Sequence, residues 1–193
     1  MLKQLFTYLF LLLVFCGCNN NRKGTSSTQN TSSAVTFKYA KNISVEQQAD
    51  YIKVSLADPW KAGNVLHTYY LVQKGSDAKV PDDGTVIQIP MERGVFFGTA
   101  HANLMEMLGN QKVIAGVADA KYMLIPDVQA RLRSKKIVDC GDGMKPDIEK
   151  IIDMKPDALL LSPFENSGGY GKLDEVKIPI IECADYMETS ALG

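Results

Sequence analysis

The sequence contains few of the residue patterns on which enzyme active sites are usually built. Its 193 residues include only two histidines and four cysteines. No CxxC, HExxH or GxSxG motif occurs, and there is no phosphate-binding loop of the Walker type. One stretch, Asp139–Asp142, places a thiol between carboxylates, but its sequence is typical of a turn. We therefore expect no catalytic residues, no metal site and no resident cofactor.

An excess of charge of one sign is also missing. The chain has 21 basic and 22 acidic residues, so its net charge is close to zero. A nucleic-acid partner normally requires a basic surface, and we therefore expect none. The length suits one medium-sized domain with an ordinary hydrophobic core.

The one long apolar run is too short to span a bilayer comfortably. It follows Lys3 and reads LFTYLFLLLVF, which together with the basic start is typical of a secretory signal peptide over residues 1–17. The break after it resembles the lipobox of bacterial lipoproteins, with Cys18 as the acylated residue. Phe15 and Cys16 depart from the usual lipobox residues. A plain signal or short anchor with incidental cysteines is the alternative.

Residues 18–34 are rich in Asn, Ser and Thr and have almost no apolar side chain. Such a segment cannot bury enough surface to offset the entropy of ordering, and we expect a disordered tether. A lipid at one end and a folded body at the other would hold the protein at a membrane of the cell envelope, facing the periplasm.

Residues 35–90 predict a β-rich extension. VTFKY, YIKVSL, HTYYLVQ and TVIQI are short, rich in β-branched and aromatic residues, and separated by turn sequences. We expect a small antiparallel sheet. Trp60 and His67 are the rare residues here, and we expect both to be structural.

From residue 91 to 185 the pattern changes to apolar strands alternating with amphipathic helices. This alternation predicts a parallel sheet flanked by helices. Ligands of such sheets bind at the carboxyl ends of the strands. Those ends carry the polar tips GTAH, ADAKY, DCGDGMK and SPFENSGGYG. On them stand the candidate ligand-binding residues His101, Asp119, Lys121, Tyr122, Met144 and Phe164.

Two of these candidates have specific chemistry. His101 could offer an imidazole to a metal or an anion, or it could be a hydrogen-bonded structural residue. Tyr122 could stack on a planar ligand or bind the iron of haem through its phenol, or it could pack on its own loop.

Two predicted helices have a defined buried face. In the helix from Thr99 to Leu108, residues Ala100, Leu104, Met107 and Leu108 recur at helical spacing. The second helix opens with Pro146, and we expect its buried stripe to be Ile148, Ile151 and Ile152. Glu149 lies off that stripe, in the first turn, and should face solvent.

Cys140 and Cys183 each follow a predicted strand. An exported protein could join them in a disulfide. Two unpaired thiols are the alternative.

The strongest local pattern is GMKPDIEKIIDMKPDALLL, a helix carrying Glu149, a Lys-Pro-Asp turn and a buried strand. With VIAGVAD and the following loop, it resembles the N-terminal lobe of the periplasmic-binding proteins that serve ABC importers for iron–siderophore, haem and cobalamin uptake. The resemblance covers about residues 91–185. It implies half of a two-lobe fold, preceded here by the β extension.

The resemblance also implies a function. Such a protein captures a small-molecule metal chelate without altering it and delivers it to an ABC permease, acting as a monomer. Glu149 matches the glutamate that docks onto permease arginines. The ligand could contain iron or cobalt: haem would favour Tyr122 or His101, siderophores basic residues such as Lys121, and cobalamin aromatic stacking.

Residues 186–193 stand where the helix between the lobes would begin, so we expect a truncated chain. Two alternatives stay open. One is a surface lipoprotein that captures cargo without an importer. The other is an enzyme lobe of the chelatase or nitrogenase-like kind, which the missing motifs disfavour.

Overall fold

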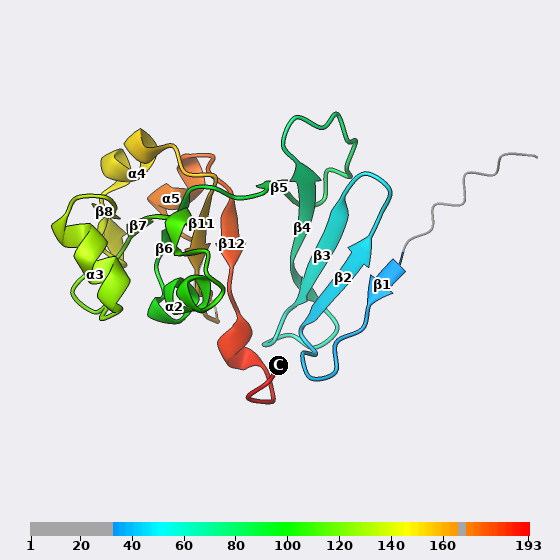
Figure 1. Cartoon of the computed structure of the whole chain (residues 1–193). Helices are drawn as coiled ribbons and strands as arrows, with labels where there is room; N and C mark the ends of the chain where they lie inside the picture. Colours follow the sequence, from blue (N-terminus) through cyan, green and yellow to red (C-terminus); the bar gives the residue numbers. More distant parts are fainter. Residues whose placement is uncertain (1–32, 166–168) are drawn as a thin grey trace, which may run out of the picture.

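The computed structural model describes residues 33–165 and 169–193. These residues form two sheets that lie side by side, with the helices gathered on the second one (Figure 1). We call the first the N-terminal sheet (residues 33–89) and the second, with its helices, the α/β lobe (residues 94–187). In the described part of the chain, no helix has the length and apolar character needed to cross a membrane.

The N-terminal sheet contains five strands in sequential order, β1-β2-β3-β4-β5. Their bounds are β1 Ser33–Val35, β2 Ile43–Gln47, β3 Ile52–Ala57, β4 Val65–Gln73 and β5 Thr85–Ile89. Neighbours among the first four are antiparallel. The predicted strands YIKVSL and HTYYLVQ correspond to β3 and β4, but the prediction of a strand at VTFKY is wrong, because only Val35 of it belongs to β1. The sequence did not predict β2, and β5 runs parallel to β4. Residues 74–84 return the chain along the sheet, which a parallel neighbour requires.

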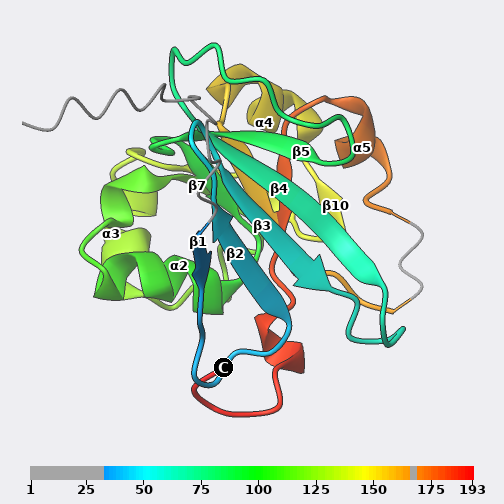
Figure 2. The ribbon, with the colours of Figure 1, turned by 90° about the vertical axis from the view of Figure 1, so that its right-hand side faces the viewer.

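The two faces of this sheet differ in character. Cross-strand register places Val45, Val54 and Tyr69 on one face. Ser44, Ser55 and Thr68 share the other face, because side chains alternate along each strand. The apolar face is turned toward the α/β lobe, and Figure 2 shows the sheet lying in front of it.

The α/β lobe is a parallel sheet in the order β12-β11-β6-β7-β8, as the sequence predicted. Its strands are β6 Gly94–Phe96, β7 Ile114–Val117, β8 Val138–Asp139, β11 Ala158–Leu161 and β12 Ile180–Glu182. The helices are α2 Thr99–Met107, η1 Gln111–Val113, α3 Pro126–Arg133, α4 Ile148–Met154, α5 Lys172–Glu175 and η2 Asp185–Met187. A two-stranded hairpin, β9 Gly141–Asp142 with β10 Lys145–Pro146, precedes α4.

Helices cover both faces of this parallel sheet. On one face, Ala102 of α2 and Val128 of α3 pack against Phe96. On the other, Ile151 of α4 and Leu173 of α5 belong to the same apolar cluster as Val95 and Leu159. Because successive strand residues point to opposite faces, β6, β7, β11 and β12 each contribute to both clusters, which explains their apolar sequences.

The predicted buried face of α2 is wrong. Leu104, Met107 and Leu108 are 47%, 75% and 68% exposed, whereas Ala102 is fully buried. A helix that lies closely on a sheet needs a small side chain at the contact, and Ala102 takes that place. The longer apolar residues consequently point outward.

Helix α4 also begins later than expected. Pro146 belongs to β10, and the N-cap of the helix is Asp147, whose carboxylate accepts the Lys150 N–H (3.1 Å). Ile151 is fully buried, as predicted, but Ile152 is 48% exposed. Glu149 is exposed.

Cys140 and Cys183 are both unpaired thiols, and burial raises the pKa of each to about 12. They follow β8 and β12, which are the two outer strands of the lobe. Four strand spacings separate these strands, about 19 Å in all. A disulfide between them is therefore excluded by distance.

Candidate functional site

A pocket of about 460 Å³ lies at the carboxyl edge of the parallel sheet. Its walls come from the segments after β6, β7 and β11, from the turn between β9 and β10, and from the start of α5. This is where ligands of open α/β sheets bind. Its main lining residues are Phe97, Asp119, Gly143, Met144, Ser162, Phe164, Tyr170 and Leu173.

Asp119 supplies a carboxylate to this pocket from a left-handed backbone conformation (φ 51°). Its N–H donates to the carbonyl of Gly141 (2.7 Å), which ties the β7 loop to the β9–β10 hairpin. A Cβ at Gly143 would lie 2.5 Å from Oδ2 of Asp119. Glycine at 143 therefore leaves the space that the carboxylate occupies, and Asp119 can accept hydrogen bonds from a ligand.

Two large apolar side chains stand at the rim of the pocket. Met144 is 84% exposed and Phe164 is 53% exposed. Apolar groups around a concave site are typical of small-molecule binding surfaces. Methionine adapts its shape readily, so this rim can fit a bulky organic ligand.

Tyr170 forms part of the inner wall. Its hydroxyl donates to Oε1 of Glu182 (2.9 Å), and its N–H donates to Oδ2 of Asp174 (2.7 Å). Burial, together with the hydrogen bond to Glu182, raises the pKa of Tyr170. The phenol is therefore neutral and presents its ring to the pocket.

The structure places three of the predicted ligand-binding residues in this pocket: Asp119, Met144 and Phe164. Lys121 and Tyr122 lie on the same loop as Asp119 but are not among the lining residues. The ammonium of Lys121 sits 4.7 Å from the ring centroid of Tyr122, which is 64% exposed. This matches the alternative in which Tyr122 packs on its own loop.

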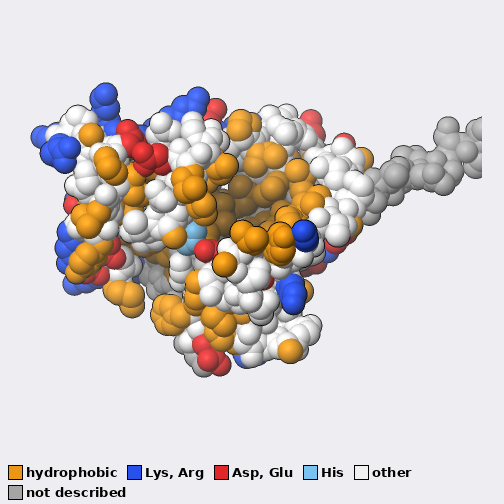
Figure 3. Space-filling view, turned by 60° about the horizontal axis from the view of Figure 1, so that its bottom comes forward, with side chains coloured by type: hydrophobic (Ala, Val, Ile, Leu, Met, Phe, Trp, Pro, Cys, Tyr) orange, Lys and Arg blue, Asp and Glu red, His pale blue; other side chains and the backbone are white. Residues whose placement is uncertain are grey.

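His101 lies elsewhere. It is only 8% exposed, and its Nε2 is 2.8 Å from Oδ1 of Asp185. It borders a second cavity, of about 340 Å³, between the N-terminal sheet and the lobe. Figure 3 shows this hollow lined by apolar side chains, with a histidine at its edge. Leu56 and Leu104 line it from the two sides.

The sequence reading missed Phe97, Ser162 and Tyr170 as pocket residues. Ser162 and Tyr170 lie on the predicted strand tip SPFENSGGYG, and Phe97 directly precedes the tip GTAH, so position alone could have identified them. Cys18 and the predicted signal peptide lie outside the described residues. Within residues 33–165 and 169–193, no group of three or more His, Cys, Asp or Glu side chains is arranged to hold a metal ion.

No family model matches this chain. It is 24% identical over 197 aligned residues to the uncharacterized lipoprotein MJ0878 of Methanocaldococcus jannaschii, covering 91% of this chain and 48% of that protein. It is 23% identical over 128 residues to the petrobactin-binding protein YclQ of Bacillus subtilis, covering 60% of this chain and 39% of that protein. The crystal structure of that petrobactin-binding protein aligns with a TM-score of 0.38 at 22% identity, over 48% of this chain and 30% of that one.

The chain thus spans about half the length, or less, of the curated relatives that it matches. One relative is named as a lipoprotein and the other as a binding protein. The first name agrees with the predicted similarity to lipoproteins, and the second with the predicted similarity to proteins that bind small molecules.

Proposed function

We propose that this chain serves as the substrate-binding lipoprotein of an ABC importer and captures an iron chelate at the carboxyl edge of its parallel sheet. The observation that carries the proposal is the pocket itself. It combines the carboxylate of Asp119, the neutral phenol of Tyr170 and the apolar rim of Met144 and Phe164. Its volume of about 460 Å³ lies in the range of small-molecule sites.

A siderophore is the ligand that we favour over haem or cobalamin. The similarity to a petrobactin-binding protein supports this choice. The side chains of the pocket also suit an organic chelator, because aromatic and thioether groups contact its rings and chains while Asp119 accepts hydrogen bonds from amide or ammonium groups.

Delivery to the permease would use Glu149. This residue is exposed in the first turn of α4, and none of the ion pairs formed by the described residues includes it. The neighbouring Lys150 is instead paired with Asp147 (3.2 Å). The carboxylate is therefore available to an arginine of the permease. A lipid on Cys18 would keep the protein at the membrane, which the similarity to a lipoprotein supports.

Equilibrium dialysis of the purified chain against ferric petrobactin, haem and cobalamin tests the binding step. We expect ferric petrobactin to bind, and Met144→Ala to weaken it roughly fivefold through lost apolar contact. Met107→Ala is the matched control, because that methionine is equally exposed but lies on α2 outside the pocket. Equal effects of the two substitutions, or binding of none of the three ligands, would reject the site.

Charge reversal tests the delivery step. Glu149→Arg should abolish uptake of the radiolabelled iron chelate by cells while the dialysis constant stays unchanged. Glu175→Arg, at another exposed acidic residue in a helix, is the control for a general charge effect. Normal uptake with Glu149→Arg would instead favour cargo capture without an importer.

A further inference from the structure

Tyr170, on the wall of the pocket, is anchored from behind by Glu182 at the end of β12. The Tyr170 hydroxyl donates to Oε1 of Glu182 at 2.9 Å. The side chain of Glu182 is only 14% exposed. A carboxylate in such a position needs hydrogen-bond donors on both oxygens, and Tyr170 satisfies one of them.

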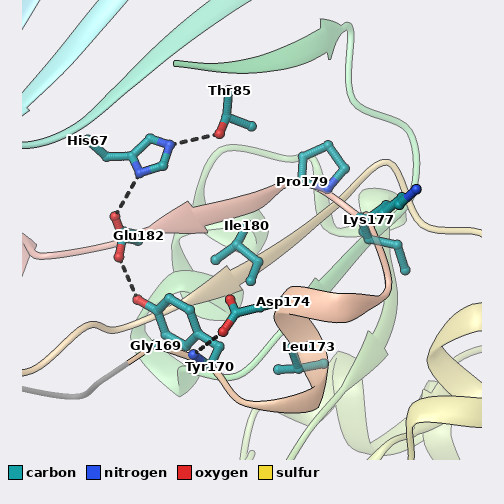
Figure 4. Close-up of a pocket in the computed structure, with 11 residues that line it drawn as sticks. His67, Thr85, Gly169, Tyr170, Leu173, Asp174, Lys177, Pro179, Ile180 and Glu182 are labelled. Atoms are coloured by element: carbon teal, nitrogen blue, oxygen red, sulfur yellow. Dashed lines mark hydrogen bonds and ion pairs between the residues drawn. The ribbon is translucent and has the colours of Figure 1, made fainter. Parts of the chain in front are cut away.

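The other oxygen of Glu182 faces the N-terminal sheet, where its nearest partner is His67. Its Oε2 lies 3.3 Å from Nδ1 of His67 on β4, and Nε2 of His67 lies 2.8 Å from Oγ1 of Thr85 on β5. These four side chains also line a neighbouring pocket of about 490 Å³. Figure 4, a close-up of that pocket, shows them in series: Thr85, His67, Glu182 and Tyr170. They connect two strands of the N-terminal sheet to the wall of the ligand pocket in the lobe.

His67 and Glu182 are both held in place by Tyr69. The His67 ring stacks on the Tyr69 ring, with centroids 4.5 Å apart and planes at 25°. The Tyr69 hydroxyl accepts the backbone N–H of Glu182 at 2.8 Å. Tyr69 is 4% exposed, and burial raises its pKa, so its hydroxyl stays neutral.

Both ring nitrogens of His67 have a polar neighbour. An ionised Glu182 only accepts, so a hydrogen on Nδ1 of His67 faces Oε2, while Nε2 shares a hydrogen bond with the hydroxyl of Thr85. These two contacts hold the ring of His67 between Thr85 and Glu182.

The backbone of Tyr170 is held at the start of α5, where its N–H donates to Asp174, and its ring packs against the apolar cluster that contains Leu173. Gly169 and Gly171 flank it, with φ of 96° and 59°. The hydrogen bond to Glu182 is the only one that fixes the hydroxyl end of the ring among the described residues. Removing this acceptor should therefore change the tilt of the ring in the pocket wall.

We propose that Glu182 is a positioning residue through which the N-terminal sheet sets the orientation of Tyr170 in the ligand pocket. The proposal deepens the binding role given above and rests on it for its consequence on affinity. The N-terminal sheet is then more than a spacer between tether and lobe: it pre-organises the site and so lowers the entropic cost of binding.

A measurement without ligand tests the positioning. Tyrosines are replaced by 3-fluorotyrosine, and the Tyr170 signal in the fluorine NMR spectrum is assigned with Tyr170→Phe. We expect Glu182→Ala and His67→Ala each to shift or broaden this signal. Glu182→Gln should preserve it, because the amide oxygen still accepts from Tyr170. The amide nitrogen can donate to Nδ1 of His67 when the ring carries its hydrogen on Nε2 and donates it to Thr85. The exposed Tyr122 provides an internal reference. An unchanged Tyr170 signal in both alanine variants would overturn the proposal.

Affinity for ferric petrobactin tests the consequence through a double-mutant cycle. His67→Ala and Tyr170→Phe should each weaken binding roughly fivefold, and the double variant should be no weaker than Tyr170→Phe alone. Thr68→Ala, on the opposite face of β4, should leave affinity unchanged. Additive losses would show that His67 acts independently of Tyr170 and would contradict the coupling. If wild-type protein fails to bind the chelate, the proposed function falls, whereas the fluorine spectra still decide the positioning role.

Discussion

The N-terminal sheet and the α/β lobe bury their apolar residues to very different degrees. In the lobe, Val95, Phe96 and Leu159 are fully buried, since helices cover both faces of the sheet. In the N-terminal sheet, Val54 and Leu56 on the lobe-facing side remain partly exposed, beside the cavity of about 340 Å³. The lobe therefore has a core covered on both faces of its sheet. The N-terminal sheet buries Tyr69, Tyr70, Val72 and Ile87, but its lobe-facing side is only partly covered.

Removal of an aromatic ring from each region should produce the largest contrast. Phe96→Ala deletes a fully buried side chain in the lobe and should lower the free energy of unfolding by about 3–5 kcal/mol. Phe37→Ala, after β1, removes a ring that is 40% exposed, and we expect roughly 1 kcal/mol. Urea unfolding followed by circular dichroism measures both. Equal losses would mean that the two regions share one continuous core.

Substitution of Asp157, which connects the two regions, should have the next largest effect on the free energy of unfolding. Asp157 accepts the backbone N–H groups of Glu92 (2.7 Å) and Arg93 (2.9 Å) and pairs with Lys74 (3.5 Å), which follows β4. Asp157→Ala leaves those N–H groups without their acceptor. Because both lie in an exposed environment where water can replace the carboxylate, we expect a loss of about 0.5–1.5 kcal/mol in urea unfolding. Asp77→Ala, at an exposed turn of the N-terminal region, is the control and should stay within about 0.5 kcal/mol.

The same carboxylate predicts a pH dependence. Burial disfavours the charged form of Asp157, but the two backbone donors and Lys74 outweigh it and hold its pKa below the usual value. A depressed folded-state pKa adds stability above the unfolded value of about 3.9 and loses it as pH falls further. Wild type should therefore lose more stability than Asp157→Asn when pH is lowered from 5 toward 2. Parallel curves for the two proteins would remove Asp157 as a source of acid sensitivity.

The sequence predicted the lobe better than the N-terminal sheet, and the reason is again the difference in burial between the two regions. Strands such as Ala158–Leu161 are buried on both faces, so they are apolar throughout and easy to identify. Strand β2 reads ISVEQ and is only partly buried, so its sequence gives a weaker signal. The parallel pairing of β5 depends on the path of residues 74–84, which local sequence does not specify.

The position of the candidate pocket was predictable, but the contacts behind it were not. Asp119, Met144 and Phe164 line this pocket because parallel strands end at one edge of the sheet; their role in binding stays a prediction. The link from His67 to Glu182 joins residues far apart in sequence, and no local pattern identifies such a pair. His101 follows a strand like the others, but its contact with Asp185 turns it toward the cavity beside the N-terminal sheet.

The smallest expected effect on stability is at Met107, on the outer face of α2. Apolar side chains on this face of the lobe are exposed, like several in the N-terminal sheet. Met107 is 75% exposed, so Met107→Ala should change the free energy of unfolding by no more than about 0.5 kcal/mol. Met123, also in the lobe but 1% exposed, is the matched reference, and Met123→Ala should cost about 2–5 kcal/mol. Such a result would mean that the loss of stability depends on how deeply each side chain is buried. It would not depend on whether the side chain lies in a helix or in a strand. A loss above about 1.5 kcal/mol for Met107→Ala would instead mean that this face of α2 is covered in the folded protein.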